Sequence, residues 1–414
     1  MADCDCDSHQ QTLKPVDEAL AFLLDQVKPI VQRETVPLSE ALGRVLADPV
    51  SSQVDVPPWD NSAMDGYAVN TQDLQNSTTR LQVGQRIPAG SAGTELLRGT
   101  AARIFTGAPV PVGADAVVMQ EVCKAEDQDV VVMEKPISGA NIRKAGEDIL
   151  QGEEILAAGL RLEPQHLGLA ASVGVAELSV FRRLRVAVFS SGDELVMPGE
   201  ELGSGQIYNS NQFTLTGLLE RLGCEVVQLG IVEDTLEATC EALSQSAEEA
   251  DLVLASGGVS VGEEDHVKPA VEQLGSLDLW KIACRPGKPL AFGHINGTPF
   301  LGAPGNPVSL FVTFSIFARP FILRMQGLTQ GILPTPISVI AGFDKPATDK
   351  RQEYARGHLE LDDQGQAVVH LYPNRSSGVL SSVVWANGIA VLPPLTAISP
   401  GDHVDFIPFN ELMS

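Results

Sequence analysis

The stretch Arg185-Val-Ala-Val-Phe-Ser190-Ser-Gly-Asp-Glu194 decides the fold of the central part of the chain. Its short apolar run, rich in β-branched and aromatic side chains, is typical of a buried strand, and an acidic Gly-containing loop follows at once. Further strands are predicted over 225–232 and 251–255 and near 279–284 and 289–295, and helices over 212–222, 236–248 and 265–274. Strands that alternate with helices of this length form right-handed βαβ units, so residues 182–328 are predicted to be an α/β domain with a mostly parallel sheet.

Acidic residues follow three successive strands of this predicted sheet. Glu194 follows the first strand, Asp234 the second and Asp265 the third. Ligands bind at the carboxyl ends of parallel strands, where three carboxylates raise one another's pKa unless a divalent cation or a cationic ligand lies among them. Helix N-capping explains Asp234 or Asp265 singly, but it explains the set poorly.

The same edge carries groups suited to an anion. Gly257-Gly258 lets backbone N–H groups turn towards an anionic ligand, and hydroxyl groups lie on either side of it. Further candidate substrate-binding residues are Ser190, Ser260, Lys281, Arg285, Lys288, Pro304, Asn306 and Pro307. The three cations stand within eight positions; a solvated hairpin tip is the alternative explanation. Asn306-Pro307 is a typical helix start, so the long helix predicted over 307–325 directs unpaired N–H groups at this edge.

The other parts of the chain have different patterns. Residues 51–140 are predicted to be a β-rich domain inserted into a mixed N-terminal domain made of 13–50 and 141–181, with helices over 16–27 and 38–46. Residues 329–414 read as a small all-β domain, and 1–12 as a flexible tail. The tail's Cys4, Cys6 and His9 could bind a soft metal, but a frayed tail is the favoured interpretation, because only three candidate ligands stand there without a packed shell. The predicted fold class is therefore multidomain α/β.

Composition excludes some functions. Lys+Arg 28 against Asp+Glu 53 gives a net charge of -25, without a basic stripe, which argues against nucleic acid and anionic membranes as partners. The N-terminus lacks a targeting pattern, and the six scattered cysteines suit a reducing compartment, so a cytoplasmic location is expected. The apolar stretch 308–325 is interrupted by polar residues and is interpreted as a buried helix.

The loop Val54-Asp-Val-Pro-Pro-Trp-Asp-Asn-Ser-Ala-Met-Asp65-Gly-Tyr-Ala-Val69 carries the other candidate site. It crowds acidic and amide groups into a segment stiffened by Pro57-Pro58 and ended by Gly66. Carboxylates held in this way can bind a hard cation or steer a proton. A solvated turn is the alternative for an Asp-Gly pair taken alone.

Six segments together resemble the molybdopterin molybdenumtransferase family. They are residues 56–68, 104–118, 190–195, 256–265, 286–290 and 304–309, and they occur in the family's order. The resemblance covers about residues 13–411. This chain has Arg285 where family members commonly have Lys, and Ala303 where they commonly have Leu.

The resemblance implies an elongated four-domain homodimer with the site across the interface. It implies insertion of molybdate into adenylylated molybdopterin, with Mg²⁺ as cofactor and release of AMP; other molybdenum-cofactor proteins are possible partners. Asp65, Asp234 and Asp265 are then candidate metal ligands, Glu194 a base or an orienting group, and Thr106 a substrate contact. Lys281, Arg285 and Lys288 would hold anionic groups, and Arg356 and Ser377 would come from the last domain.

Other functions remain open from the sequence. The adenylyltransferase step of the same pathway uses smaller proteins that share the α/β domain, and a pyridine-nucleotide amidase or pyrophosphatase is a remoter possibility. A scaffold that polymerises or docks partners belongs to another class. The segments around Asp65 and Thr106 and the C-terminal β domain favour metal insertion.

Overall fold

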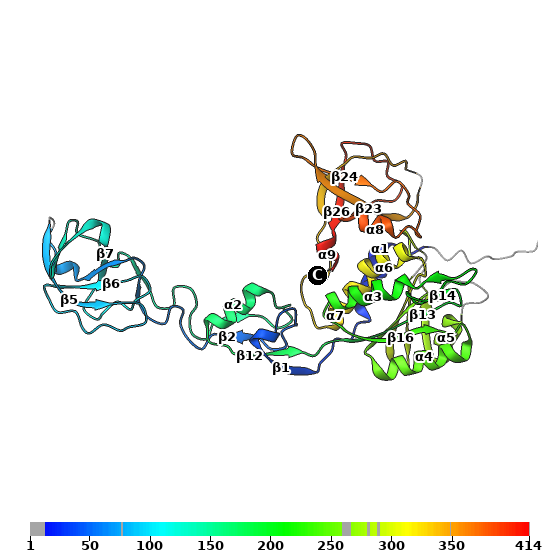
Figure 1. Cartoon of the computed structure of the whole chain (residues 1–414), viewed down its shortest axis with the longest axis horizontal. Helices are drawn as coiled ribbons and strands as arrows, with labels where there is room; N and C mark the ends of the chain where they lie inside the picture. The colour runs from blue at the N-terminus through cyan, green and yellow to red at the C-terminus, as the bar shows by residue number, and fades with distance from the viewer. Residues whose placement is uncertain are drawn as a thin grey trace, which may run out of the picture.

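The computed structural model describes residues 13–75, 78–258, 266–279, 282–287, 290–347 and 349–413. The chain is an elongated row of bodies (Figure 1). A β-rich body with β5, β6 and β7 lies at one end, α2 and β12 lie in the middle, and the α/β body with the last β body lies at the other end. The expectation of a multidomain α/β chain with several sheets is confirmed.

The α/β body contains a six-stranded sheet with the order β16-β13-β17-β21-β20-β18. β16 (Glu225–Val232), β13 (Arg185–Ser191), β17 (Leu252–Ser256) and β21 (Thr298–Ala303) are parallel. β20 (Ala291–Ile295) pairs antiparallel with β21, and β18 (Gly275–Leu279) pairs antiparallel with β20. Helices α3 (Ser210–Arg221), α4 (Leu236–Glu249) and α5 (Val267–Leu274) connect or follow these strands. The prediction missed β21 and placed the strand before β20 several residues too late.

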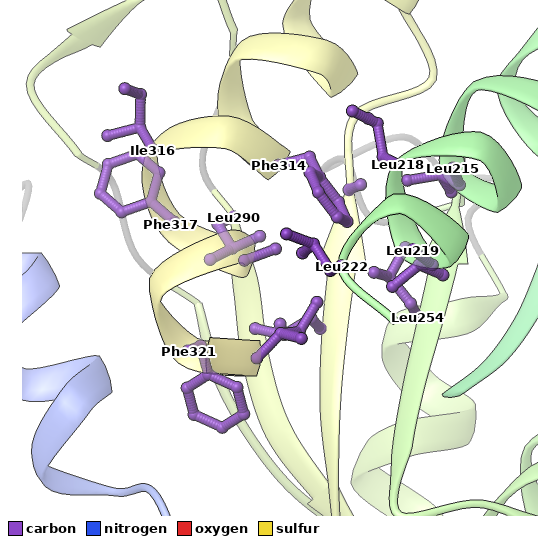
Figure 2. Packing of buried hydrophobic residues seen from close by; sticks show 14 of the residues in the cluster. Leu215, Leu218, Leu219, Leu222, Leu254, Leu290, Phe314, Ile316, Phe317 and Phe321 are labelled. Atoms are coloured by element: carbon purple, nitrogen blue, oxygen red, sulfur yellow. The ribbon is translucent and has the colours of Figure 1, made fainter. Parts of the chain in front are cut away.

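A long apolar helix lies in the core of this body. It consists of α6 (Pro307–Thr313), a π-helical turn (Phe314–Ala318) and α7 (Arg319–Met325). Pro320 follows the wide turn and has no N–H to donate to a preceding carbonyl. Figure 2 shows Phe314 facing the leucines of α3. The helix is long and apolar enough to cross a membrane, but 94% of its most apolar window is buried within the protein, as in a core helix.

The first residues of the chain differ from the sequence prediction. α1 (Val16–Asp25) forms, and it packs in the same hydrophobic cluster as the long helix and α3. The second helix predicted over 38–46 is wrong. Leu38–Glu40 is a single 3-10 turn, and Gly43 has a φ of 74°, which interrupts a right-handed helix. Leu46 instead pairs with Val180 in an isolated bridge and is buried.

Short strand pairs build the middle of the row. β1 (Arg33–Pro37) pairs with β12 (Glu177–Phe181), β2 (Val50–Ser51) with β11 (Glu154–Leu156), and β3 (Asn61–Ser62) with β10 (Ile142–Arg143). α2 (Pro164–Ser172) contributes Ala170 to the hydrophobic cluster that β1 and β12 share. Two stretches far apart in sequence therefore run side by side and lead out to the β-rich body (Figure 1).

The β-rich body is a six-stranded sheet with the order β7-β4-β6-β5-β9-β8. Its strands are β4 (Gly66–Val69), β5 (Thr79–Ile87), β6 (Thr100–Ile104), β7 (Ala116–Met119), β8 (Cys123–Glu126) and β9 (Asp129–Val132). β4 lies between β6 and β7 and pairs antiparallel with both. The residue before β4 is Asp65, so the sheet fixes the backbone beside this candidate.

The last body is a small β-barrel. β23 (Gln352–Leu361) pairs with both β24 (Ala367–Leu371) and β25 (Gly388–Leu392), and β22 (Ile337–Ala341) and β26 (His403–Pro408) complete the ring. Two short helices accompany it, α8 (Ser381–Trp385) and α9 (Phe409–Met413). β19 (Cys284–Arg285), from a loop of the α/β part of the chain, pairs with β23. This pairing holds the barrel next to the loop that carries Arg285.

Candidate functional site

The carboxyl ends of β13 and β16 bring two acidic loops together. The Ser191 hydroxyl donates to Asp234 Oδ1 at 3.2 Å, and the Asp234 N–H donates to Asp193 Oδ1 at 3.3 Å. Glu194 is exposed on the same loop, and a Cβ added to Gly192 would stand 2.5 Å from its Oε2. Glu194 and Asp234 therefore lie at one edge of the sheet, joined through the short segment 191–193.

The end of β17 comes very close to this loop. Gly257 and Gly258 have φ angles of 89° and 65°, which favour glycine. A Cβ at Gly257 would stand 2.7 Å from the Ser191 carbonyl oxygen, and one at Gly258 would stand 2.5 Å from Val267 Cγ2. The glycines thus let the end of β17 pack closely against the end of β13 and against the start of α5. Ser260 and Asp265 follow them and lie outside the described residues.

Asn211, which the sequence reasoning missed, ties the edge together. Its Nδ2 donates to Ser256 Oγ at 2.9 Å and to the Gly305 carbonyl at 2.7 Å. Its Oδ1 is buried and has no hydrogen-bond partner in the described part of the chain. Nearby, the Ser190 hydroxyl lies 3.4 Å from Asn209 Oδ1. The orphaned amide oxygen is a buried acceptor at the site, whereas Ser190 is already engaged with protein.

The start of the long helix is the meeting point of three segments. Asn306 holds the N-cap position without a side-chain cap, and Pro307 is the first helical residue. The Val308 N–H donates to the Ser377 carbonyl at 3.0 Å, so the barrel reaches the helix terminus. A Cβ at Gly287 would lie 3.5 Å from Ser309 Cβ, which places the loop after Arg285 there too. Pro304, just before Asn306, is buried.

Two arginines at this junction already have protein partners. Arg285 forms an ion pair with Asp349 at 2.7 Å, and hydrogen bonds from Arg351 and Arg285 hold the pKa of Asp349 well below its usual range. Arg356 is buried and donates to Ser382 Oγ and to the carbonyls of Asn374 and Ser376. Burial lowers the pKa of Arg356. Arg356 thus supports the turn that carries Ser377. Lys281 and Lys288 lie outside the described residues.

The structure brings Asp65 and Thr106 into direct contact. Asp65 Oδ1 accepts from both the Thr106 N–H and the Thr106 hydroxyl, each at 2.8 Å. These bonds, helped by the nearby Arg103 guanidinium, hold the pKa of Asp65 below its usual value. At the end of the β4–β6 pair, the Thr106 side chain is exposed and the Asp65 side chain is half-buried. The carboxylate is therefore ionised, oriented and open to a ligand.

Within one chain the two candidate regions are far apart. Asp65 and Thr106 belong to the β-rich body at one end of the row, whereas Asp234 belongs to the α/β body at the other (Figure 1). Within the described ranges, no group of three or more His, Cys, Asp or Glu side chains gathers to hold a metal ion. One chain by itself does not assemble the three predicted metal ligands among its described residues.

Three family models match consecutive parts of the chain. The MoeA N-terminal region (domain I and II) matches residues 14–174, the probable molybdopterin binding domain 187–324, and the MoeA C-terminal region (domain IV) 338–409. Together they span almost all of the described chain, in the order in which its bodies follow one another.

Full-length relatives agree with these matches. The molybdopterin molybdenumtransferase of Haemophilus influenzae is 42% identical over 400 residues, covering 96% of this chain and 99% of the relative. The molybdopterin molybdenumtransferase of Nostoc sp. is 40% identical over 90% of this chain and 87% of the relative. The crystal structure of the molybdopterin biosynthesis MoeA protein from Pyrococcus horikoshii OT3 superposes with a TM-score of 0.83 at 30% identity, over 96% of this chain and 100% of that one. The chain therefore belongs to the MoeA family of molybdopterin molybdenumtransferases, and it is a transferase of molybdenum cofactor biosynthesis.

Proposed function

We propose that the protein inserts molybdate into adenylylated molybdopterin and releases AMP. The observation that carries the proposal is the convergence of three segments on one helix terminus: the loop after Arg285, the start of the helix at Pro307, and the barrel turn at Ser377. The Val308 N–H is already used by the Ser377 carbonyl, so not all of the N–H groups predicted to be unpaired here are free. The partial positive charge of a helix start still favours anionic groups, and cations beside it add to this attraction. A phosphoanhydride and a tetrahedral dianion both need such an environment.

The residues of the edge have separable roles in this proposal. The positive end of the helix dipole at residues 306–309 and the Arg285 side chain neutralise charge that develops on the departing phosphate. Ser377 and Lys288 are proposed to add donors for oxyanions. Glu194, exposed at the edge, orients a donor or removes a proton. Thr106 donates to Asp65 and is placed to meet the substrate beside it.

The donor chemistry of the acidic residues fits Mg²⁺. Asp65 and Asp234 offer hard carboxylate oxygens, which this ion prefers, and Asp65 keeps Oδ2 free of the two Thr106 bonds. Asp65, Asp234 and Asp265 are the proposed ligands of the ion or of its waters. When bound, Mg²⁺ would supply positive charge to phosphate oxygens.

The distance between Asp65 and Asp234 along one chain leads us to include a homodimer in the proposal. The β-rich body of one subunit then meets the α/β edge of the second, and each site takes Asp65 and Thr106 from one chain and Asp234 from the other. Oligomers with twofold symmetry make two such sites at once.

The test is molybdate-dependent release of AMP from adenylylated molybdopterin in the presence of Mg²⁺. The Asp65→Asn variant keeps the size and the acceptor for Thr106 but loses the charge, and we expect its rate to fall about 100-fold or more. Asp129→Asn is the matched control, because Asp129 lies in the same sheet in an exposed ion pair with Arg80. A wild-type protein that releases no AMP, but forms adenylylated pterin from ATP, would instead be the adenylyltransferase of the pathway.

A further inference from the structure

A row of cationic and aromatic side chains crosses the β-rich sheet beside Asp65. Arg86 on β5 is paired in register with Arg103 on β6, and Arg103 with Tyr67 on β4. Both guanidinium carbons lie over the ring of Phe105, at 4.5 and 4.6 Å from its centroid, and Arg103 also lies 5.2 Å from that of Tyr67. Residues opposite each other on neighbouring strands share one face, so the two arginines stand side by side.

This arrangement is unusual for a chain with a net charge of -25. Like charges opposite each other in a sheet are destabilising, and within the described ranges neither Arg86 nor Arg103 forms an ion pair with a carboxylate. Arg80, on the same strand as Arg86, has its charge neutralised in the usual way, by ion pairs with Glu126 and Asp129. The adjacent pair is therefore not explained by pairing within the sheet.

The two guanidinium groups differ in how much of their hydrogen-bonding capacity is used. Arg103 donates to the Gly66 carbonyl at 2.9 Å and to Gln120 Oε1 at 2.6 Å. Arg86 is exposed, and among the described residues no protein acceptor takes a hydrogen bond from it. Stacking on Phe105 fixes the plane of its guanidinium and leaves the N–H fork open, the geometry that recognises oxyanions.

The row also has a defined position relative to the candidate site. Phe105 precedes Thr106, and Gly66, whose carbonyl Arg103 binds, follows Asp65. An anion held by the arginines would thus lie next to the open carboxylate and hydroxyl.

We propose that Arg86 and Arg103, stacked on Phe105, form a binding site for a tetrahedral oxyanion beside Asp65 and Thr106. The identity of that oxyanion rests on the proposed function, which offers two sources, the phosphate of the adenylylated substrate and molybdate. Arg86 supplies the open fork, and Arg103 supplies charge while it holds the backbone after Asp65.

The experiment is a calorimetric titration of the full-length protein with AMP and, separately, with molybdate. Arg86→Gln removes the charge from an exposed position, and we expect it to weaken binding of one probe about tenfold, the loss of one charge-assisted contact. Arg86→Lys keeps the charge without the planar fork and should recover only part of the affinity. Arg80→Gln, on the same strand, is the matched control and should bind as the wild type does.

Each outcome decides the site. If Arg86→Gln binds AMP more weakly than the wild type does, the site holds the phosphate of the substrate. If the variant binds molybdate more weakly, the site holds molybdate. Unchanged affinity of Arg86→Gln for both probes, or no binding of either probe by the wild type, overturns the proposal.

Activity measurements on the same proteins separate this site from the proposed function. Weakened oxyanion binding in Arg86→Gln, with no AMP release by the wild type, supports the site and rejects the function. Full transferase activity with unchanged affinity and unchanged KM in Arg86→Gln rejects the site and keeps the function.

Discussion

The absence of a Cβ atom at Gly66 determines where the neighbouring residue Asp65 can lie. A Cβ at this residue would stand 1.9 Å from the Val118 carbonyl oxygen on β7, whose backbone cannot move without breaking the pairing with β4. The Asp-Gly sequence is therefore a packing requirement of the sheet as well as a turn signal. The carboxylate of Asp65 points towards Thr106 because the strand that follows it has no freedom.

Gly66→Ala should consequently disrupt the β-rich sheet and the Asp65 site together. We expect a loss of about 2–3 kcal/mol or more in the stability of this sheet, since the added methyl group meets backbone. Hydrogen exchange of the β4 and β7 amides measures it. Gly84→Ala on β5 is the control, because its Cβ would have no atom closer than 3.9 Å. Equal protection of these amides in the two variants would contradict the prediction, because it would show that the sheet accommodates a methyl group at Gly66.

Individual site residues were predictable to different degrees. Asp65 and Asp234 were selected because they stand in distinctive loops, whereas Thr106 was selected through the family resemblance; their roles stay predictions. Ser191, Asn211 and Arg86 were missed, because their importance comes from contacts rather than from pattern. Nothing in the sequence says that the Asn211 amide spans two loops, or that Arg86 and Arg103 share a register.

At the scale of elements, alternating strands and helices were read correctly where the apolar runs are long. The helix predicted over 38–46 does not form, although the apolar residues of this segment recur at helical spacing. Gly43, which has a positive φ, was the signal against a helix. In place of helical neighbours, Leu46 has a bridge partner that is remote in sequence, Val180. Local periodicity cannot reveal a pairing of that kind.

Asp251 joins elements at the entry to the α/β sheet. It accepts two hydrogen bonds from Arg182, at 2.7 and 2.6 Å, and one from the Arg185 N–H at 2.9 Å. Burial raises the pKa of Asp251, but these hydrogen bonds outweigh it and hold the pKa below its usual value. The carboxylate thereby ties the strand that enters the body to the start of β17.

Asp251→Asn should lower the free energy of unfolding by about 1–2 kcal/mol at pH 7. Because the folded-state pKa is depressed, the contribution is present above the ordinary pKa and is lost as the pH falls through the folded value. Urea unfolding of wild type and variant at pH 7 and at pH 3 measures the difference, which should shrink at the lower pH. Glu225→Gln, which removes an exposed pair with Arg185, should cost less at either pH. A difference as large at pH 3 as at pH 7 would rule out the carboxylate charge as its source.

At the scale of the whole molecule, the separation of Asp65 from the α/β edge is the main structural fact about function. The β-rich body is connected through narrow paired strands, so the body and the edge are at opposite ends of the row (Figure 1). Sequence reasoning from residues alone could not place these regions relative to each other, because distance between domains leaves no local pattern.

Complementation between two inactive variants tests whether the site is shared between subunits. Asp65→Asn and Asp234→Asn should each lack AMP release alone. In a shared site, a mixed dimer has one site with both carboxylates intact and one with neither. Random exchange of subunits in an equal mixture should then restore about a quarter of the wild-type activity. Two variants altered in the same body, Asp234→Asn and Glu194→Gln, are the control and should restore none. Activity that stays absent after subunit exchange, itself verified by mass spectrometry of the mixed dimers, would mean that each chain completes its own site, and the β-rich body would have to move to reach it.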